Sequence, residues 1–157
     1  MSEQRLPLPG GRSGELSVEL ACIGLQAALT HARENQLQVS IAVVDRGGHL
    51  LAMARVDGTP WHSIDLAIDK ACTSASFGLP SSALGEMIDN ASERVRLNLT
   101  LRPDIVAMGG AVPIMLGDQL VGALGVSGAS EQEDHQCSLT GCEAIVLAAE
   151  SLHSVKE

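Results

Sequence analysis

Two basic side chains lie where they could recognise an acidic group. Arg55 ends a predicted hairpin, so its guanidinium could grip a carboxylate or form a structural pair with Asp57 or another acid. Lys70 lies on a predicted helix face otherwise made of small residues, where a ligand or another backbone can come close. The sequence therefore predicts either anion binding by Lys70 or a structural bond from Lys70 to strand carbonyls.

Glycines flank two predicted strands in the second half of the chain. Gly109 and Gly110 precede one strand, and Ser127 lies in the string Gly125-Val-Ser-Gly128 at the end of another. Because glycine permits close backbone approach, we expect Gly109, Gly110 and Ser127 to contact a bound ligand.

Acidic residues follow directly, at the predicted start of the last helix. Backbone N–H groups near Glu131 could hold an anion, and Glu131 or Asp134 could move a proton. Ordinary helix-dipole stabilisation also favours acids at this place, and Ser130 with Glu133 has the spacing of a capping box. The acids thus predict either a functional helix start or an ordinary one.

The histidines and cysteines give little support for a metal site. His31 lies at the rim of an apolar helix face, where it could act as a ligand or border a packing contact. The other histidines form no HxxxH or HExxH spacing, and the four cysteines form no CxxC pair. We therefore expect no bound metal ion outside a cofactor, and four small buried thiols.

Composition excludes several classes of function. The 157 residues suffice for one domain, predicted over 14–157 after a flexible leader at 1–13. Trp61 and Phe77 are the only aromatic residues and the formal net charge is −9, which argues against nucleic-acid binding. No apolar run approaches the ~20 residues that span a bilayer, and the start does not resemble a secretory leader. We expect a cytoplasmic protein that binds neither nucleic acid nor membrane.

Hydrophobic periodicity predicts the elements that would position these residues. The expected fold is an α/β protein of the α+β type, an antiparallel five-stranded sheet flanked by helices. The first helix is apolar on two sides, which predicts a homo-oligomer. The predicted helices cover 14–36, 62–76, 82–94 and 130–152, and the predicted strands cover 37–44, 49–55, 105–107, 112–116 and 119–126.

Five strings in order resemble the GlcG/HbpS-like family, which includes the C-terminal domain of PduO-type adenosyltransferases. The resemblance implies a profilin-like or roadblock-like sheet flanked by helices, and assembly from dimers to octamers. Several members of the family bind haem, and others are encoded with catabolic enzymes. The strings are Val43-Val-Asp-Arg-Gly-Gly-His-Leu50, Arg55-Val-Asp-Gly58, Ala67-Ile-Asp-Lys-Ala71, Gly109-Gly-Ala-Val-Pro-Ile114 and Val121-Gly-Ala-Leu-Gly-Val-Ser-Gly128.

Two functions follow as hypotheses. In the first, the protein binds or senses haem as its cofactor, with His31 on the iron and basic residues near the propionates. In the second, it is an enzyme of small-molecule catabolism that acts on an unsaturated or hydroxy carboxylic acid. Arg55 and Lys70 would hold that carboxylate, while Glu131 or Asp134 would transfer the proton. A purely structural role as an assembly subunit is a third reading.

Overall fold

A computed structural model describes residues 15–154 of the chain, so the predicted leader lies outside the described residues. Five helices and four strands alternate in groups along these residues. In chain order they are α1 (Val18–Glu34), β1 (Ser40–Asp45), β2 (Leu50–Arg55), α2 (Ser63–Phe77), α3 (Ser81–Asp89), α4 (Glu93–Thr100), β3 (Ala111–Leu116), β4 (Gln119–Ser127) and α5 (Glu131–Ser154).

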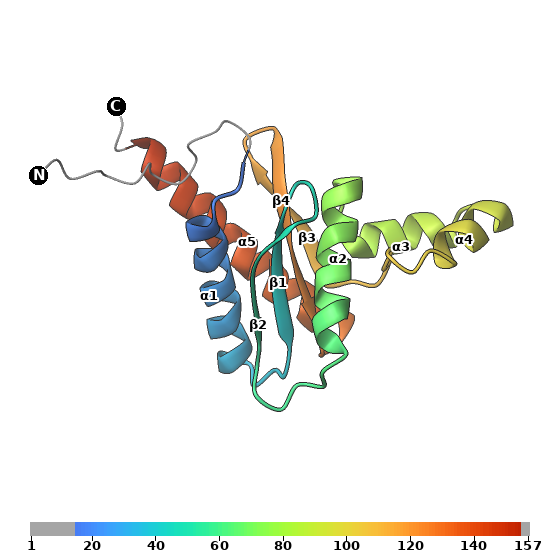
Figure 1. The fold of residues 1–157 in the computed structure, drawn as a ribbon, viewed down its shortest axis with the longest axis horizontal. Helices are drawn as coiled ribbons and strands as arrows, with labels where there is room; N and C mark the ends of the chain where they lie inside the picture. Colours follow the sequence, from blue (N-terminus) through green and yellow to red (C-terminus); the bar gives the residue numbers. More distant parts are fainter. Residues whose placement is uncertain (1–14, 155–157) are drawn as a thin grey trace, which may run out of the picture.

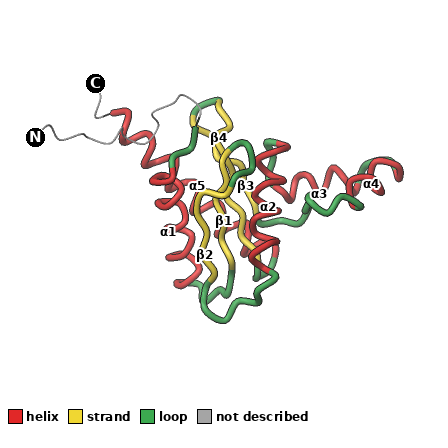
Figure 2. The backbone as a smooth tube through the Cα atoms, in the orientation of Figure 1, coloured by secondary structure: helices red, strands yellow, loops and turns green. Residues whose placement is uncertain are grey.

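The molecule has three layers with the sheet in the middle (Figure 1). Helices α1 and α5 pack against each other on one face of the sheet, and α2 covers the other face. Helices α3 and α4 project from the α2 side as an arm, most clearly in the backbone trace (Figure 2). None of the described helices is long and apolar enough to cross a membrane.

The sheet is antiparallel, as predicted, but it has four strands in the order β2-β1-β4-β3 instead of five. The strand predicted at 105–107 is irregular backbone. Its Val106 N–H, which a strand would donate to a neighbour, donates instead to Thr73 Oγ1 at 3.0 Å. Alternating apolar residues alone could not reveal that competing partner.

The helix predicted at 82–94 is two helices. The first, α3, ends at Asp89, and Ser92 begins α4 as its N-cap because its hydroxyl accepts the Val95 N–H. Residues of α4 are exposed or half-buried throughout, so the body of the protein does not cover this helix.

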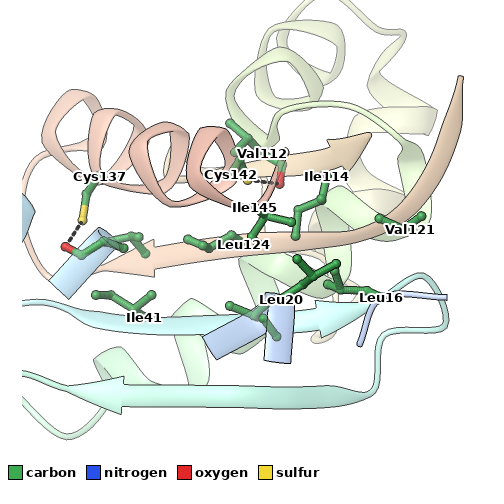
Figure 3. Close-up of a cluster of buried hydrophobic side chains, with 14 of the residues drawn as sticks. Leu16, Leu20, Ile41, Val112, Ile114, Val121, Leu124, Cys137, Cys142 and Ile145 are labelled. Carbon is green, nitrogen blue, oxygen red and sulfur yellow. Dashed lines mark hydrogen bonds between the residues drawn. The ribbon is translucent and has the colours of Figure 1, made fainter. Parts of the chain in front are cut away.

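The core is aliphatic and lies between the sheet and the α1/α5 layer (Figure 3). Leu, Ile, Val and Ala fill most of it, and none of the described methionines is fully buried. Cys137 and Cys142 belong to this core, and burial raises the pKa of each thiol to about 12. The prediction that all four cysteines are buried was wrong, because Cys22 is exposed and Cys72 is half-buried.

Candidate functional site

Lys70 and Asp134 form a buried ion pair that joins α2 to the start of α5. Lys70 Nζ donates to Asp134 Oδ2 at 3.0 Å and to the Val126 carbonyl of β4 at 3.1 Å. The other carboxylate oxygen, Asp134 Oδ1, accepts the Ala129 N–H at 3.0 Å. The structural alternative for Lys70, a bond to a strand carbonyl, is thus present. We call this arrangement the Lys70–Asp134 bridge.

Gly110 makes room for the bridge where β3 begins. A Cβ atom at this position would lie 2.9 Å from Lys70 Nζ, 2.9 Å from Asp134 Cβ and 2.5 Å from the Val126 carbonyl oxygen. The backbone φ of Gly110 is +131°, a conformation that side chains disfavour. The structure of the bridge therefore explains why residue 110 is glycine, without a contact to a ligand.

The electrostatics of Asp134 reflect its burial. Loss of water raises the pKa of this carboxyl, while Lys70 and the N–H groups of Ala129 and Gly128 act in the opposite direction. The side chains of Lys70 and Asp134 are only 3% and 2% exposed. Since they are buried and occupied by each other, neither is free to meet a ligand in this conformation.

Glu131 and Gly109 border a hollow beside the base of the α3–α4 arm. Glu131 Oε1 accepts the Gly109 N–H at 2.7 Å, which ties the start of α5 to the segment before β3. The hollow encloses about 510 Å³, and the Nδ1 atom of His135 is buried in this region without a hydrogen-bond partner. Its other acidic lining residues are Glu86 and Asp89.

Arg55 lies apart from this acidic hollow. Its Nη1 donates to the Thr59 carbonyl at 2.8 Å, and it lines a different hollow of about 540 Å³ between α1 and β2. The two hollows share no lining residue. Arg55 makes no ion pair with Asp57, although both residues are described. Ser127 is buried opposite Ser40 of the neighbouring strand.

The residues predicted to serve an acid–base enzyme therefore do not form one site, because Arg55 lies apart from the others. Lys70, Asp134, Gly110, Glu131 and Gly109 come together at the start of α5, but most of their polar groups are engaged with one another. No observation favours the enzyme hypothesis, which stays a prediction. Among the described residues, no group of three or more His, Cys, Asp or Glu side chains could hold a metal ion.

His31 lies in a different kind of environment, a groove between α1 and α5. The groove is open to solvent and has a volume of about 510 Å³, and the surface that its lining residues expose is mainly apolar. The side chain of His31 is half-buried there. The lining residues are Ile23, Gln26, Ala27, Thr30, His31 and Glu34 of α1, with Thr140 and Ala144 of α5.

Hydrogen bonds favour one tautomer of the His31 ring. Thr140 Oγ1 lies 3.4 Å from His31 Nδ1 and donates its single proton to the Gln136 carbonyl at 2.9 Å. With that proton used, the hydroxyl is an acceptor for the ring, which favours the tautomer with the proton on Nδ1 and a lone pair on Nε2. No hydrogen bond engages Nε2 within the described part of the chain.

Thr140 is a candidate site residue that sequence reasoning missed. It is separated from His31 by 109 positions, and nothing in its own surroundings marks it. Only the crossing of α1 and α5 brings the two side chains together, so a single sequence holds no local signal for this pair.

The sequence of this three-layer α+β protein is similar to that of a known family. Residues 16–143 match the family described as haem degrading protein HbpS-like. The chain is 34% identical to protein GlcG of Escherichia coli over 112 residues, which cover 71% of this chain and 81% of GlcG. The chain therefore belongs to the HbpS-like family, as its sequence motifs indicate.

Solved structures agree with this assignment. The crystal structure of HbpS has a TM-score of 0.77 with 32% sequence identity, and the match covers 84% of this chain and 91% of HbpS. A crystal structure of a PduOC:heme complex has a TM-score of 0.76 with 25% identity, covering 83% of this chain and 94% of the other. The fold is thus one in which a haem complex has been observed.

Proposed function

We propose that this protein binds haem in the groove between α1 and α5, with Nε2 of His31 as the protein ligand to the iron. The observation that carries the proposal is a half-buried histidine whose Nε2 is unpartnered and which lines an apolar groove. Neutral imidazole is a common axial ligand of haem iron. The family description and the PduOC:heme complex support the same ligand class.

The residues of the groove offer the kinds of contact that a porphyrin needs. Ile23, Ala27 and Ala144 offer apolar contacts, and a volume of about 510 Å³ is within the usual range of small-molecule sites. When bound, haem would supply an iron centre for ligand or redox chemistry. The chain itself holds the imidazole through Thr140 and keeps water from part of the porphyrin face.

The propionates require a different explanation from the one predicted. Lys70 is occupied by the bridge, Arg55 lines another hollow, and neither lines the groove. The described lining of the groove contains no lysine or arginine, and its acidic residue is Glu34. We therefore expect the propionates to point away from Glu34 and toward solvent.

A second copy of the chain would shield the open side of the porphyrin, and we expect a homo-oligomer between a dimer and an octamer. Ile23, which lines the groove, is 42% exposed. Elsewhere on the surface, Leu97 of α4 and Leu101, directly after α4, are 51% and 79% exposed. Burial of such side chains favours association. Light scattering at micromolar concentration tests this expectation, and a monomer would contradict it.

Haem titration of His31→Ala tests the proposed function. We expect wild type to give a stable Soret shift that survives removal of excess haem, and His31→Ala to lose it with an unchanged circular dichroism spectrum. His62→Ala is the matched control, because His62 is exposed and its side chain does not cap α2. Equal haem affinity of wild type and His31→Ala would refute the assignment of the ligand.

A further inference from the structure

A third hollow lies against α2, on the opposite side of the sheet from the groove of His31 between α1 and α5 (Figure 1). It encloses about 480 Å³ between the β1–β2 turn and the segment that follows α4. It shares no lining residue with the groove of His31. The residues that bear its polar groups are Arg46, Asp69, Cys72, Thr73, Ser76, Arg102 and Asp104.

The turn wall of this hollow is held in place by side-chain hydrogen bonds. Asp45 Oδ1 accepts the N–H groups of Gly47 at 2.8 Å and His49 at 3.0 Å, which fixes the turn that carries Arg46. Cys72 Sγ of α2 donates to the Gly48 carbonyl at 3.3 Å. The turn is thus fastened to the helix and not merely adjacent to it.

The opposite wall is fastened to the same helix. Thr73 Oγ1 donates to the Asp69 carbonyl at 2.7 Å and accepts the Val106 N–H at 3.0 Å. This bond holds the segment containing Arg102 and Asp104 against α2. Both walls are therefore preorganised, which lowers the entropic cost of binding a small molecule between them.

The charged groups of this hollow are only partly satisfied. Arg102 Nε lies 3.6 Å from Asp104 Oδ1, in an exposed pair that water screens. Neither Arg46 nor Asp69 makes an ion pair with any residue that the structure describes. Burial raises the pKa of Asp69, and the negative charges of Asp65 and Asp104 add to this effect. A donor that binds this carboxyl would relieve the cost of its burial.

We propose that this hollow binds a small carboxylic acid that also carries a hydroxyl or ammonium group. The guanidinium of Arg46 holds the carboxylate, with Arg102 as a second cation, and the carboxyl of Asp69 accepts the hydroxyl or ammonium donor. Residues of two family-like strings, 43–50 and 67–71, line this hollow, whereas none of the five strings lines the groove of His31. The proposal does not depend on haem binding.

An NMR titration with three four-carbon acids tests both halves of the proposal. Succinate offers carboxylates alone, malate adds a hydroxyl and aspartate adds an ammonium group. We expect malate or aspartate to bind more tightly than succinate and to shift the amide signals of Gly47, Gly48 and Ile105. Absence of such shifts for all three acids, or equal affinity for all three, would overturn the proposal.

Substitutions separate the two recognition groups. Arg46→Gln should weaken the preferred acid about tenfold, the loss expected for one charge-assisted bond. The matched control is Arg94→Gln, because Arg94 is exposed on α4 and does not line the hollow. Asp69→Ala should bring the affinity for the preferred acid down to that for succinate. Unchanged binding in both site variants would contradict the assignment.

Cysteine labelling gives an independent readout of where the acid binds. The bound acid should slow alkylation of the half-buried Cys72 and leave the exposed Cys22 unaffected. Equal rates of Cys72 alkylation with and without the saturating acid would place it elsewhere. Inorganic phosphate is the competing anion, and tighter binding of phosphate than of malate and aspartate would overturn the choice of ligand class.

Discussion

The Lys70–Asp134 bridge and the His31 groove differ in how many of their polar atoms already have hydrogen-bond partners. In the bridge, both carboxylate oxygens of Asp134 have partners and the ammonium group of Lys70 has two acceptors. In the groove, one ring nitrogen of His31 is oriented by Thr140 and the other is free. A fully satisfied buried pair maintains structure, whereas a half-satisfied group beside a groove is available to a ligand.

The largest effect expected from this difference is the loss of the bridge. Lys70→Met keeps an apolar chain of similar length but leaves Asp134 buried without its counter-charge. We expect the free energy of unfolding to fall by about 3–5 kcal/mol at pH 7. Urea denaturation measures this loss of stability. Arg55→Met is the control, because Arg55 is an exposed cation whose side chain donates to one carbonyl.

The pH dependence of this variant has a defined sign. Burial already raises the pKa of Asp134 in the folded protein, and removing Lys70 takes away an opposing effect. The folded state then binds the proton more tightly than the unfolded state, so stability falls as pH rises above the unfolded pKa. The loss in Lys70→Met should be smaller at pH 4 than at pH 7. A loss below about 1 kcal/mol at both values would refute a structural role for the bridge.

The next largest effect concerns the room that Gly110 provides. Gly110→Ala should destabilise the protein by at least about 2 kcal/mol, because a strained φ is added to contacts of 2.5 Å and 2.9 Å. Gly117→Ala is the control, since Gly117 also has a positive φ but has open space around it. Thermal and urea unfolding should give a clearly larger loss for Gly110→Ala. Equal losses would mean that the backbone conformation alone matters.

A smaller effect is expected in the groove, where Thr140 positions His31. Thr140→Val keeps the shape of the side chain and removes the hydroxyl that accepts from Nδ1. Haem affinity should fall about tenfold, as when partners of a metal-bound histidine are removed, while the Soret maximum stays in place because the iron ligand is unchanged. Thr30→Val is the control, because Thr30 lines the same groove from α1. This variant should bind haem as wild type does. An unchanged affinity of Thr140→Val would refute the tautomer argument.

How far sequence reasoning reached differs between these regions for a physical reason. The antiparallel sheet and its flanking helices follow from local periodicity, and both bonds of the Ser130–Glu133 capping box are present. Lys70 was recognised as unusual from its helix face, but its partner Asp134 is 64 positions away. Thr73 and Val106 form a similar distant pair, which removed the fifth predicted strand. Local patterns thus predict elements, while side-chain pairs between distant elements decide which predicted residues remain free.

The smallest effect is expected at the exposed side of the same helix start that carries the bridge. Ser130 Oγ accepts the Glu133 N–H at 3.2 Å, and the Ser130 N–H donates to Glu133 Oε2 at 3.0 Å. Ser130→Ala should cost about 1 kcal/mol, the ordinary value of an N-cap hydroxyl. The backbone and side-chain hydrogen bonds from Ser130 hold the pKa of Glu133 below its usual range. Their stabilising effect is present above the unfolded pKa and is lost as pH falls through the folded pKa, so Ser130→Ala should differ less from wild type in acid. Urea unfolding at pH 7 and pH 3 measures the change, and an effect as large as that of Lys70→Met would remove the distinction between buried and exposed contacts at this helix start.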